Sequence, residues 1–246
     1  DLPRDSFYFF TGNNTFKENY EKDFDGELVN IVECTFFETY TKDYCNSSSL
    51  NNEVFSSHRR SKHFLSLNRS PRLHRGKMFN YLKKNNLLKY GYVSYIDENY
   101  YVDGELTTNA EDNQAGAFIE REYFENSYFN IVTETWFYEK SLFLTEKIFK
   151  SVIYHQPFLL LSGYHSLKLF KELGYKTFDS IIDESYDDIK DDEIRFSMIM
   201  DQINRLSKMT IDEVHDMYLS VKDILEYNYD HLLSEHDVMG IEFFNQ

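Results

Sequence analysis

The stretch FENSYFNIVTETWFYEKSLFLTEKIFKSVIYHQPFLLLSG, residues 124–163, decides the fold class. YFNIVT at 128–133 predicts a β-strand, and PFLLL at 157–161 predicts a second strand that is fully apolar. Between them, the residues from Thr145 to Tyr154 predict a helix. A strand, a helix and a strand in this order favour an α/β fold with a parallel sheet covered by helices.

The start of this predicted helix carries three polar residues. Thr145 belongs to the residue types that cap helix N-termini, which places Glu146 and Lys147 in the first turn. A glutamate is favourable at the positive end of the helix dipole, whereas a lysine is not. The lysine therefore indicates a nearby anion, and the adjacent carboxylate can accept hydrogen bonds from ribose hydroxyls. On spacing alone, both residues can equally be ordinary surface residues.

A basic loop lies upstream of this stretch. HFLSL at 63–67 predicts a short strand, residues 68–75 its C-terminal loop, and residues 76–88 a helix. LNRSPRLHR, residues 67–75, holds three arginines and a histidine in a chain whose net charge is −16. Cations between a strand end and a helix start suit a phosphate, because the helix N-terminus adds free N–H groups. The alternative is a solvated basic loop without a ligand.

The other segments extend the same pattern. We expect strands at 7–10, at 28–37 and at 90–96, the first of them buried and ending in the turn Thr11–Asn14. We expect helices at 165–173, closed by Gly174, at 192–207 and at 210–234, the last with a capping box of Thr210 and Glu213. Loops are expected at 41–57 and 97–117. Alternating strands and helices predict a Rossmann-like sheet with helices on both faces. Ligands of such sheets bind beyond the carboxyl ends of the strands.

Composition limits the classes of function. The chain has 246 residues, 17% of them aromatic, which is enough for a substantial core. No run of about 18 apolar residues occurs, so we expect no membrane span, and the N-terminal residues do not read as a signal peptide. The two cysteines, Cys34 and Cys45, are expected to be ordinary thiols in the cytoplasm. The net charge of −16 disfavours binding to nucleic acid.

Motifs for other chemistries are missing from the sequence. The eight histidines show no H-E-x-x-H or Cys/His ligand spacing, and no Walker loop, G-x-G-x-x-G or G-x-S-x-G occurs. We therefore expect neither a metal nor a cofactor. The acidic run DESYDDIKDDE, residues 183–193, is interpreted as a solvated charge run at a helix start rather than as a metal site.

The ordered motifs resemble a known class of enzyme. FENS, then TEK opening a helix, then a strand beginning with PF resembles the donor-binding motif of the alpha-1,3-fucosyltransferases. From His63 to Asp188, about half the chain, LNRSPRLHR, ETWF, FLTEKIFK, PF, LGYKTF and DESYD look similar to glycosyltransferase-like proteins of phages and large viruses. The resemblance implies a GT-B architecture, with a nucleotide sugar bound between two Rossmann-like halves.

Carried over to this sequence, the resemblance implies that Arg75 and Lys147 bind the diphosphate of a nucleotide sugar and that Glu146 holds the ribose. Arg72 would assist at the phosphates. Two further residues, Asn126 and Glu134, would line the same cleft with less defined roles. Residues 1–57 would be a reduced N-terminal, acceptor-side segment, and residues 58–246 the donor-binding domain with a helical tail.

The implied reaction is metal-independent transfer of a sugar to a glycan or other hydroxyl acceptor, with inversion at the anomeric carbon. Such an enzyme needs a general base, usually a carboxylate. Glu18, Glu21 and Asp25 are candidates, and the sequence does not select among them. Two alternatives remain: a phage-type DNA-base glycosyltransferase, against which the net charge counts, and a non-catalytic module, which the short N-terminal segment favours. The expected location is the cytoplasm, which for a viral protein is the cytoplasm of the host.

Overall fold

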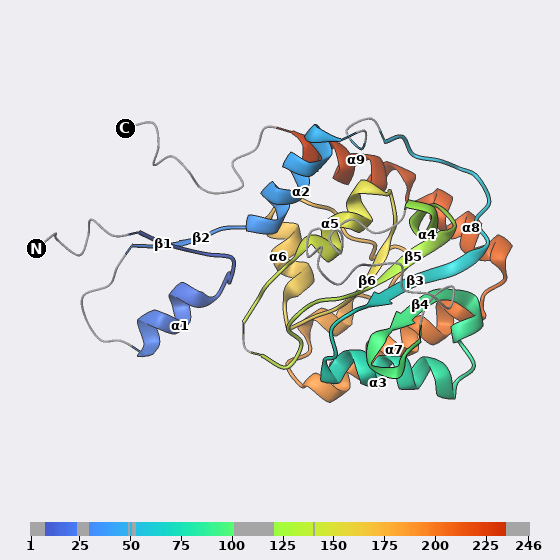
Figure 1. The fold of residues 1–246 in the computed structure, drawn as a ribbon, viewed down its shortest axis with the longest axis horizontal. Helices are drawn as coiled ribbons and strands as arrows, with labels where there is room; N and C mark the ends of the chain where they lie inside the picture. Colours follow the sequence, from blue (N-terminus) through green and yellow to red (C-terminus); the bar gives the residue numbers. More distant parts are fainter. Residues whose placement is uncertain are drawn as a thin grey trace, which may run out of the picture.

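The structure is a computed structural model that describes residues 8–23, 30–48, 50, 53–100, 121–139 and 141–234. Its largest sheet has four parallel strands in the order β4-β3-β5-β6 (Figure 1). These are β3 (Lys62–Asn68), β4 (Gly91–Tyr95), β5 (Ser127–Thr133) and β6 (Phe158–Leu161). Every residue of β5 and β6 is buried, as is typical of a parallel sheet covered on both faces. The predicted α/β fold is confirmed, and it is compatible with a Rossmann-like fold.

Helices connect and cover these strands. α3 (Leu73–Lys84) joins β3 to β4, and α5 (Glu146–Ile153) joins β5 to β6. The two connections run in opposite directions across the sheet, and right-handed crossovers therefore place α3 and α5 on opposite faces (Figure 1). Further helices of the main body in the described ranges are α4 (Arg121–Glu125), α6 (Ser166–Glu172), α7 (Asp192–Lys208), α8 (Ile211–Ser220) and α9 (Lys222–Leu233), with short 3-10 turns at Leu88–Tyr90, Ile96–Glu98 and Ser185–Asp188.

The core is rich in aromatic side chains that the parallel strands bring together. Phe64 of β3 and Phe129 of β5 are fully buried, with ring centroids 5.8 Å apart. Burying each such ring contributes roughly 2–3 kcal/mol. Gly91 begins β4 because a Cβ at that position would lie 2.3 Å from the Phe64 ring. The glycine therefore lets strand β4 pair closely beside this ring.

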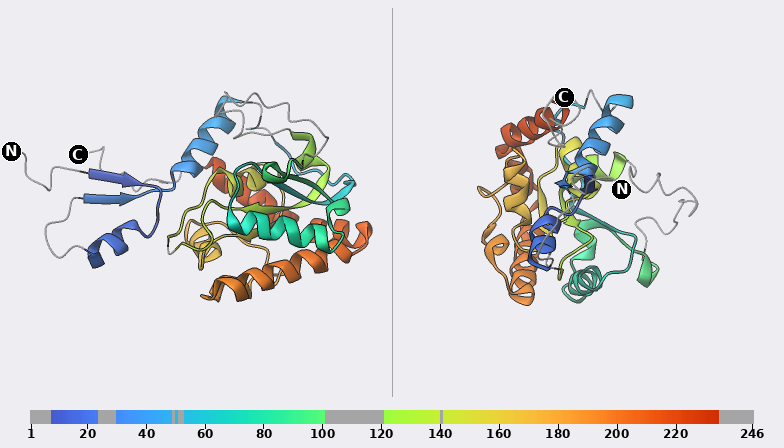
Figure 2. Two further views of the ribbon diagram at one scale, coloured as in Figure 1. Left: turned by 60° about the horizontal axis from the view of Figure 1, so that its bottom comes forward. Right: turned by 90° about the vertical axis from the view of Figure 1, so that its left-hand side faces the viewer.

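The N-terminal part forms a separate small sheet. β1 (Tyr8–Thr11) and β2 (Asn30–Glu33) are parallel, with α1 (Phe16–Asp23) between them. Figure 2 shows this unit projecting from the main body. The prediction of a buried first strand is wrong, because Tyr8, Phe9 and Phe10 are each 46–47% exposed. β1 pairs with β2 and contacts α1 through the rings of Phe9 and Phe16, 5.1 Å apart, which leaves about half of these side chains exposed.

Helix α2 (Phe36–Ser47) corrects two further predictions. The strand expected at 28–37 ends at Glu33, and the loop expected at 41–57 is helical as far as Ser47. α2 packs against α5 and α9, with Thr41 and Cys45 fully buried. The Ser- and Asn-rich residues from Asn46 to Asn52, at and beyond the end of α2, made the whole stretch look like a loop. A division of the chain near residue 57 stays a prediction.

The C-terminal helices largely follow the expectation. Gly174 closes α6 with φ +93°, a backbone conformation that favours glycine, and Thr210 and Glu213 form the predicted capping box. The single helix expected at 210–234 is two helices, which meet at the buried Val221. The helix expected at 76–88 begins earlier, at Leu73. None of the helices in the described ranges combines the length and the apolarity needed to cross a bilayer.

The acidic run at 183–193 is only partly the solvated charge run that was predicted. Asp191 caps α7 as expected, because its side chain accepts hydrogen bonds from the N–H groups of Glu193 and Ile194. Asp187, in contrast, is 8% exposed and accepts from the backbone N–H groups of Leu167 and Lys168 at the start of α6. The run therefore supplies fixed hydrogen-bond acceptors to two helix starts.

Candidate functional site

The candidate site lies where the sheet changes direction. β3 and β5 are neighbours, and the chain leaves their carboxyl ends toward opposite edges of the sheet. Such a switch point leaves a crevice beyond the strand ends, which is the usual ligand position in open α/β sheets. Five of the six predicted site residues follow these strand ends, at the start of α3, directly after β5 and at the start of α5: Arg72, Arg75, Glu134, Glu146 and Lys147.

Glu134, directly after β5, holds the start of α5. Its side chain is fully buried, and its carboxylate accepts hydrogen bonds from the Thr145 N–H at 2.9 Å and from Thr145 Oγ1 at 2.6 Å. The Thr145 hydroxyl in turn accepts from the backbone N–H and from Nζ of Lys147, at 3.4 and 2.7 Å. Burial raises the pKa of Glu134, and the positive charge of Lys147 opposes this shift. The predicted N-cap is confirmed, with Glu134 as its unexpected support.

Lys147 forms a charged cluster with Glu134 and Glu146, and its ammonium group reaches solvent. Its side chain is 28% exposed, and Nζ lies 3.2 Å from Glu146 Oε1 and 3.8 Å from Glu134 Oε2. Burial acts to raise the pKa of Glu146, but the charges of Lys147 and Lys150 outweigh it, so this pKa is lowered. Any anion that binds here must therefore compete with two carboxylates for the same ammonium group.

Lys150 is a member of the cluster that the sequence reasoning missed. It lies one turn after Glu146 on α5 and is 6% exposed. Burial lowers the pKa of Lys150 to about 8, although the negative charge of Glu146 acts in the opposite direction. The spacing of four residues between a glutamate and a lysine on one helix is a signal that could have identified this pair.

Arg75 is buried and bonded to the protein rather than open to a ligand. It is 4% exposed, and its guanidinium donates to the carbonyls of Ser70, Thr133 and Glu134 at 3.0–3.2 Å. Its Nε is buried and has no acceptor among the described residues. Three of the five guanidinium N–H groups therefore donate to backbone carbonyls, and the predicted role of Arg75 as a phosphate ligand stays a prediction. The other contacts tie the first turn of α3 to the end of β5.

His74 reinforces the same connection, and the sequence reasoning gave it no role. Its Nε2 lies 2.9 Å from the Glu134 carbonyl oxygen, so this nitrogen carries the hydrogen and donates. Burial lowers the pKa of His74 to about 4, which keeps the ring neutral at pH 7. Deeper in the sheet, Thr133 Oγ1 donates to Asn68 Oδ1 across β5 and β3. These bonds fix the floor of the crevice.

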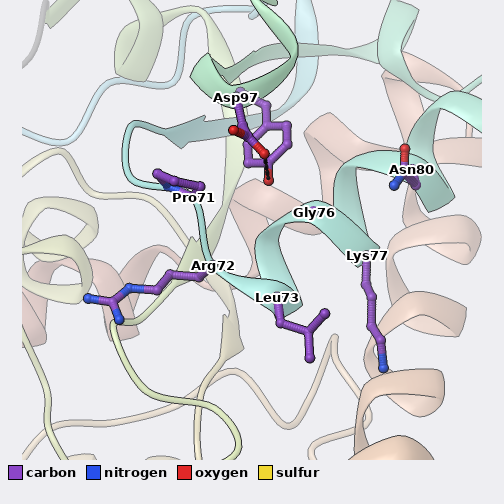
Figure 3. A pocket seen from close by; sticks show the side chains of 8 residues that line it. Pro71, Arg72, Leu73, Gly76, Lys77, Asn80 and Asp97 are labelled. Atoms are coloured by element: carbon purple, nitrogen blue, oxygen red, sulfur yellow. Dashed lines mark hydrogen bonds between the residues drawn. The ribbon is translucent and has the colours of Figure 1, made fainter.

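Arg72 precedes α3 and is exposed. It lines a shallow depression of about 430 Å³ beside α3 and the end of β4, together with Pro71, Leu73, Gly76, Lys77, Asn80, Tyr95 and Asp97 (Figure 3). Figure 3 shows Arg72 and Lys77 pointing away from each other. Lys77 is paired with Glu193 on α7 at 2.6 Å. Arg72 therefore offers a solvent-facing guanidinium at the rim of the site.

Asn126 is the predicted site residue that the structure does not bring to the crevice. It precedes β5, whereas Glu134 follows it, so the seven residues of the strand separate them by about 25 Å. Its side chain donates to the Glu122 carbonyl in α4. Of the candidate bases, Glu18 pairs with Lys22 on exposed α1 and Glu21 is exposed on the same helix, while Asp25 lies outside the described residues.

The arrangement can bind an anion with hydroxyl groups attached. It offers the partly exposed ammonium of Lys147 and the N-terminus of α5 to the anion, and the Glu146 carboxylate to hydroxyl donors. Within the described ranges, no three His, Cys, Asp or Glu side chains are arranged to hold a metal ion. No protein-family model, no curated protein and no solved structure matches this chain.

Proposed function

We propose that this protein is a glycosyltransferase that takes a sugar from a nucleotide-diphosphate sugar and transfers it to a hydroxyl acceptor. The observation that carries the proposal is the position of Lys147. It lies in the first turn of α5, at the switch point of a parallel sheet, beside a carboxylate whose pKa is lowered. The ammonium group of Lys147 would bind the diphosphate, and the Glu146 carboxylate would accept hydrogen bonds from the ribose hydroxyls.

In this proposal the leaving nucleoside diphosphate is stabilised electrostatically. As the bond from the sugar to the diphosphate breaks, negative charge grows on the phosphate oxygens. Lys147 and the N-terminus of α5 would stabilise this charge. Arg72 adds a second cation from the rim. Arg75 would contribute its positive charge without direct contact to the phosphates, because most of its N–H groups already donate to backbone carbonyls.

A GT-B-like arrangement with an inverting, metal-independent reaction is the finer form of the proposal. The turn between β1 and α1 contacts the loop that leads into α5, so the N-terminal unit faces the proposed donor site. A carboxylate on that side would serve as general base, and no residue is assigned to this role. The cysteines that the structure describes, Cys34 and Cys45, are free and buried, which suits the proposed cytoplasmic location.

Replacing Lys147 with alanine is expected to weaken binding of a nucleoside diphosphate by about 1.5–3 kcal/mol, the range for a charge-assisted hydrogen bond. Calorimetric titration of both proteins with the diphosphate that binds best measures the difference. Lys168→Ala is the matched control, because Lys168 lies on α6 and its side chain is 58% exposed. Equal affinities for the wild type and Lys147→Ala would contradict the assignment.

A non-catalytic binding module is a second candidate, favoured by one observation. Both Lys147 and Arg75 already have protein partners, as they would in a fold that retained the site for stability. Release of nucleoside diphosphate from UDP-, GDP-, ADP- or CDP-sugars separates the two. An enzyme releases the diphosphate, at least slowly to water, and Lys147→Ala does not. A module that binds without release would leave the sugar nucleotides intact.

A further inference from the structure

The turn between β1 and α1 forms hydrogen bonds with Leu142, a residue of the loop that leads into α5. The N–H of Asn14 donates to the Leu142 carbonyl at 3.0 Å, and the N–H of Leu142 donates to Thr15 Oγ1 at 3.3 Å. Both backbone groups of Leu142 are thus held by the N-terminal unit. Beside them, Asn13 Nδ2 donates to Ser141 Oγ at 3.3 Å.

Aromatic packing next to these bonds makes the contact specific. Phe143 lies so close to Gly12 that a Cβ at this glycine would be 2.8 Å from the ring. The same ring packs against Phe37 of α2 and against Trp136, with centroids 5.5 and 5.0 Å apart. Phe143 therefore lies between the turn, α2 and the residues that follow β5.

The contact is close in sequence to the proposed donor site. Leu142 precedes Thr145 by three residues, and Thr145 is fixed at its other side by Glu134. The segment from Leu142 to Lys147 is therefore held at two points, one on the N-terminal turn and one on the main sheet. The N-terminus of α5 and the ammonium of Lys147 take their positions from both.

We infer that the turn Thr11–Thr15 is a positioning element for the anion site, acting through the backbone of Leu142 on Thr145, Glu146 and Lys147. Its effect on ligand binding rests on the proposed function, whereas its hold on the loop does not. Because coupling between two sites is reciprocal, an anion bound at Lys147 must also stabilise the turn, which it does not contact. The small N-terminal unit thereby acquires a role in donor binding.

The test combines hydrogen exchange with ligand binding in the full chain. Thr15→Val removes the hydroxyl that accepts from Leu142 while it keeps the side-chain shape, and Thr15→Ser restores the hydroxyl. Thr210→Val is the matched control, because the Thr210 hydroxyl also accepts a backbone N–H, that of Glu213 at the start of α8. The probe is inorganic pyrophosphate, and exchange is followed in peptides covering residues 11–16 and 141–147.

Thr15→Val removes two hydrogen bonds, one from the Leu142 N–H and one to Asn13 Oδ1 within the turn. It is expected to accelerate exchange in 141–147 and to weaken pyrophosphate binding, each by about fivefold, the size expected for the bond that reaches the loop. Thr15→Ser restores both values and Thr210→Val changes neither. In the wild type, pyrophosphate slows exchange in 11–16.

Unchanged exchange in 141–147 of Thr15→Val overturns the inference. Faster exchange with unchanged affinity overturns it as well, because the contact is then structural only. If the wild type binds no pyrophosphate, it is the proposed function that fails. The exchange rates of the variants still decide whether the turn holds the loop.

Discussion

Replacing Arg195 with alanine is expected to lower the free energy of unfolding by about 4 kcal/mol, which is within the range for breaking a buried charged network. Arg195, on α7, is 1% exposed and stacks on the Phe137 ring at 4.6 Å. Its guanidinium donates to Asp192 and to the carbonyls of Phe137, Ser162, Ile189 and Lys190. Alanine would remove this donor from the carbonyls of Phe137 and Ser162, where the bonds are buried.

The same residue connects the site to the main body. Phe137 belongs to the segment between β5 and α5, and Ser162 follows β6. Arg195 therefore holds the carboxyl ends of two strands on α7. Urea unfolding followed by circular dichroism measures the loss. Arg205→Ala on the same helix is the control, because Arg205 is exposed and is expected to contribute less than about 1 kcal/mol. Similar losses for both variants would show that Arg195 has no special role.

Acidification is expected to destabilise the protein between pH 6.5 and pH 4, chiefly through two histidines. Burial lowers the pKa of both His74 and His155 from 6.5 to about 4. The unfolded chain therefore takes up protons in this window while the folded chain does not, so stability falls as the pH falls. A shift of this size corresponds to roughly 3 kcal/mol for each ring.

Other groups act in the opposite direction and must be separated from the histidines. Burial raises the pKa of Glu134 and of Asp187, so the folded protein holds their protons more tightly than the unfolded chain does. These two carboxyl groups therefore favour the folded state as the pH falls, and the net loss is smaller than the histidines alone would give. A comparison with a variant isolates one histidine.

His74→Gln is the suitable variant, because the glutamine amide can still donate to the Glu134 carbonyl but cannot be protonated. The difference in unfolding free energy between pH 7 and pH 4.5 is measured in urea for both proteins. Over this pH window the variant is expected to lose roughly 2.5 kcal/mol less than the wild type. An identical pH dependence would mean that His74 does not remain neutral in the folded protein.

The sequence predicted the parallel sheet and the α5 cap, because these features depend on local patterns. YFNIVT and PFLLL are apolar enough to be core strands, and Thr145 is a local cap. α2 was missed because its buried face is made by Thr41 and Cys45 within a polar composition, and only packing on α5 and α9 reveals it. The exposure of Phe9 and Phe10 likewise depends on which elements cover them.

The role of individual site residues was less predictable than their location. Arg75 was expected to face a phosphate, but the carbonyls at the end of β5 occupy most of its donors. Asn126 was grouped with Glu134 because they are close in sequence. They lie at the two ends of strand β5, however, and therefore at opposite ends of the sheet. Contacts of this kind depend on the assembled sheet and cannot be read from spacing.

Recognition of a nucleoside diphosphate is the central claim, and a thermal-shift comparison tests it most directly. The wild type is heated with each of GDP, UDP, ADP and CDP, and with the corresponding nucleosides, which lack phosphate. At about 100 times its Kd, a ligand adds about 2.7 kcal/mol of stability, or about 5–10 °C for a chain of this size. We predict that at least one diphosphate gives such a shift and that its nucleoside does not. Equal midpoints with and without every diphosphate would contradict the account.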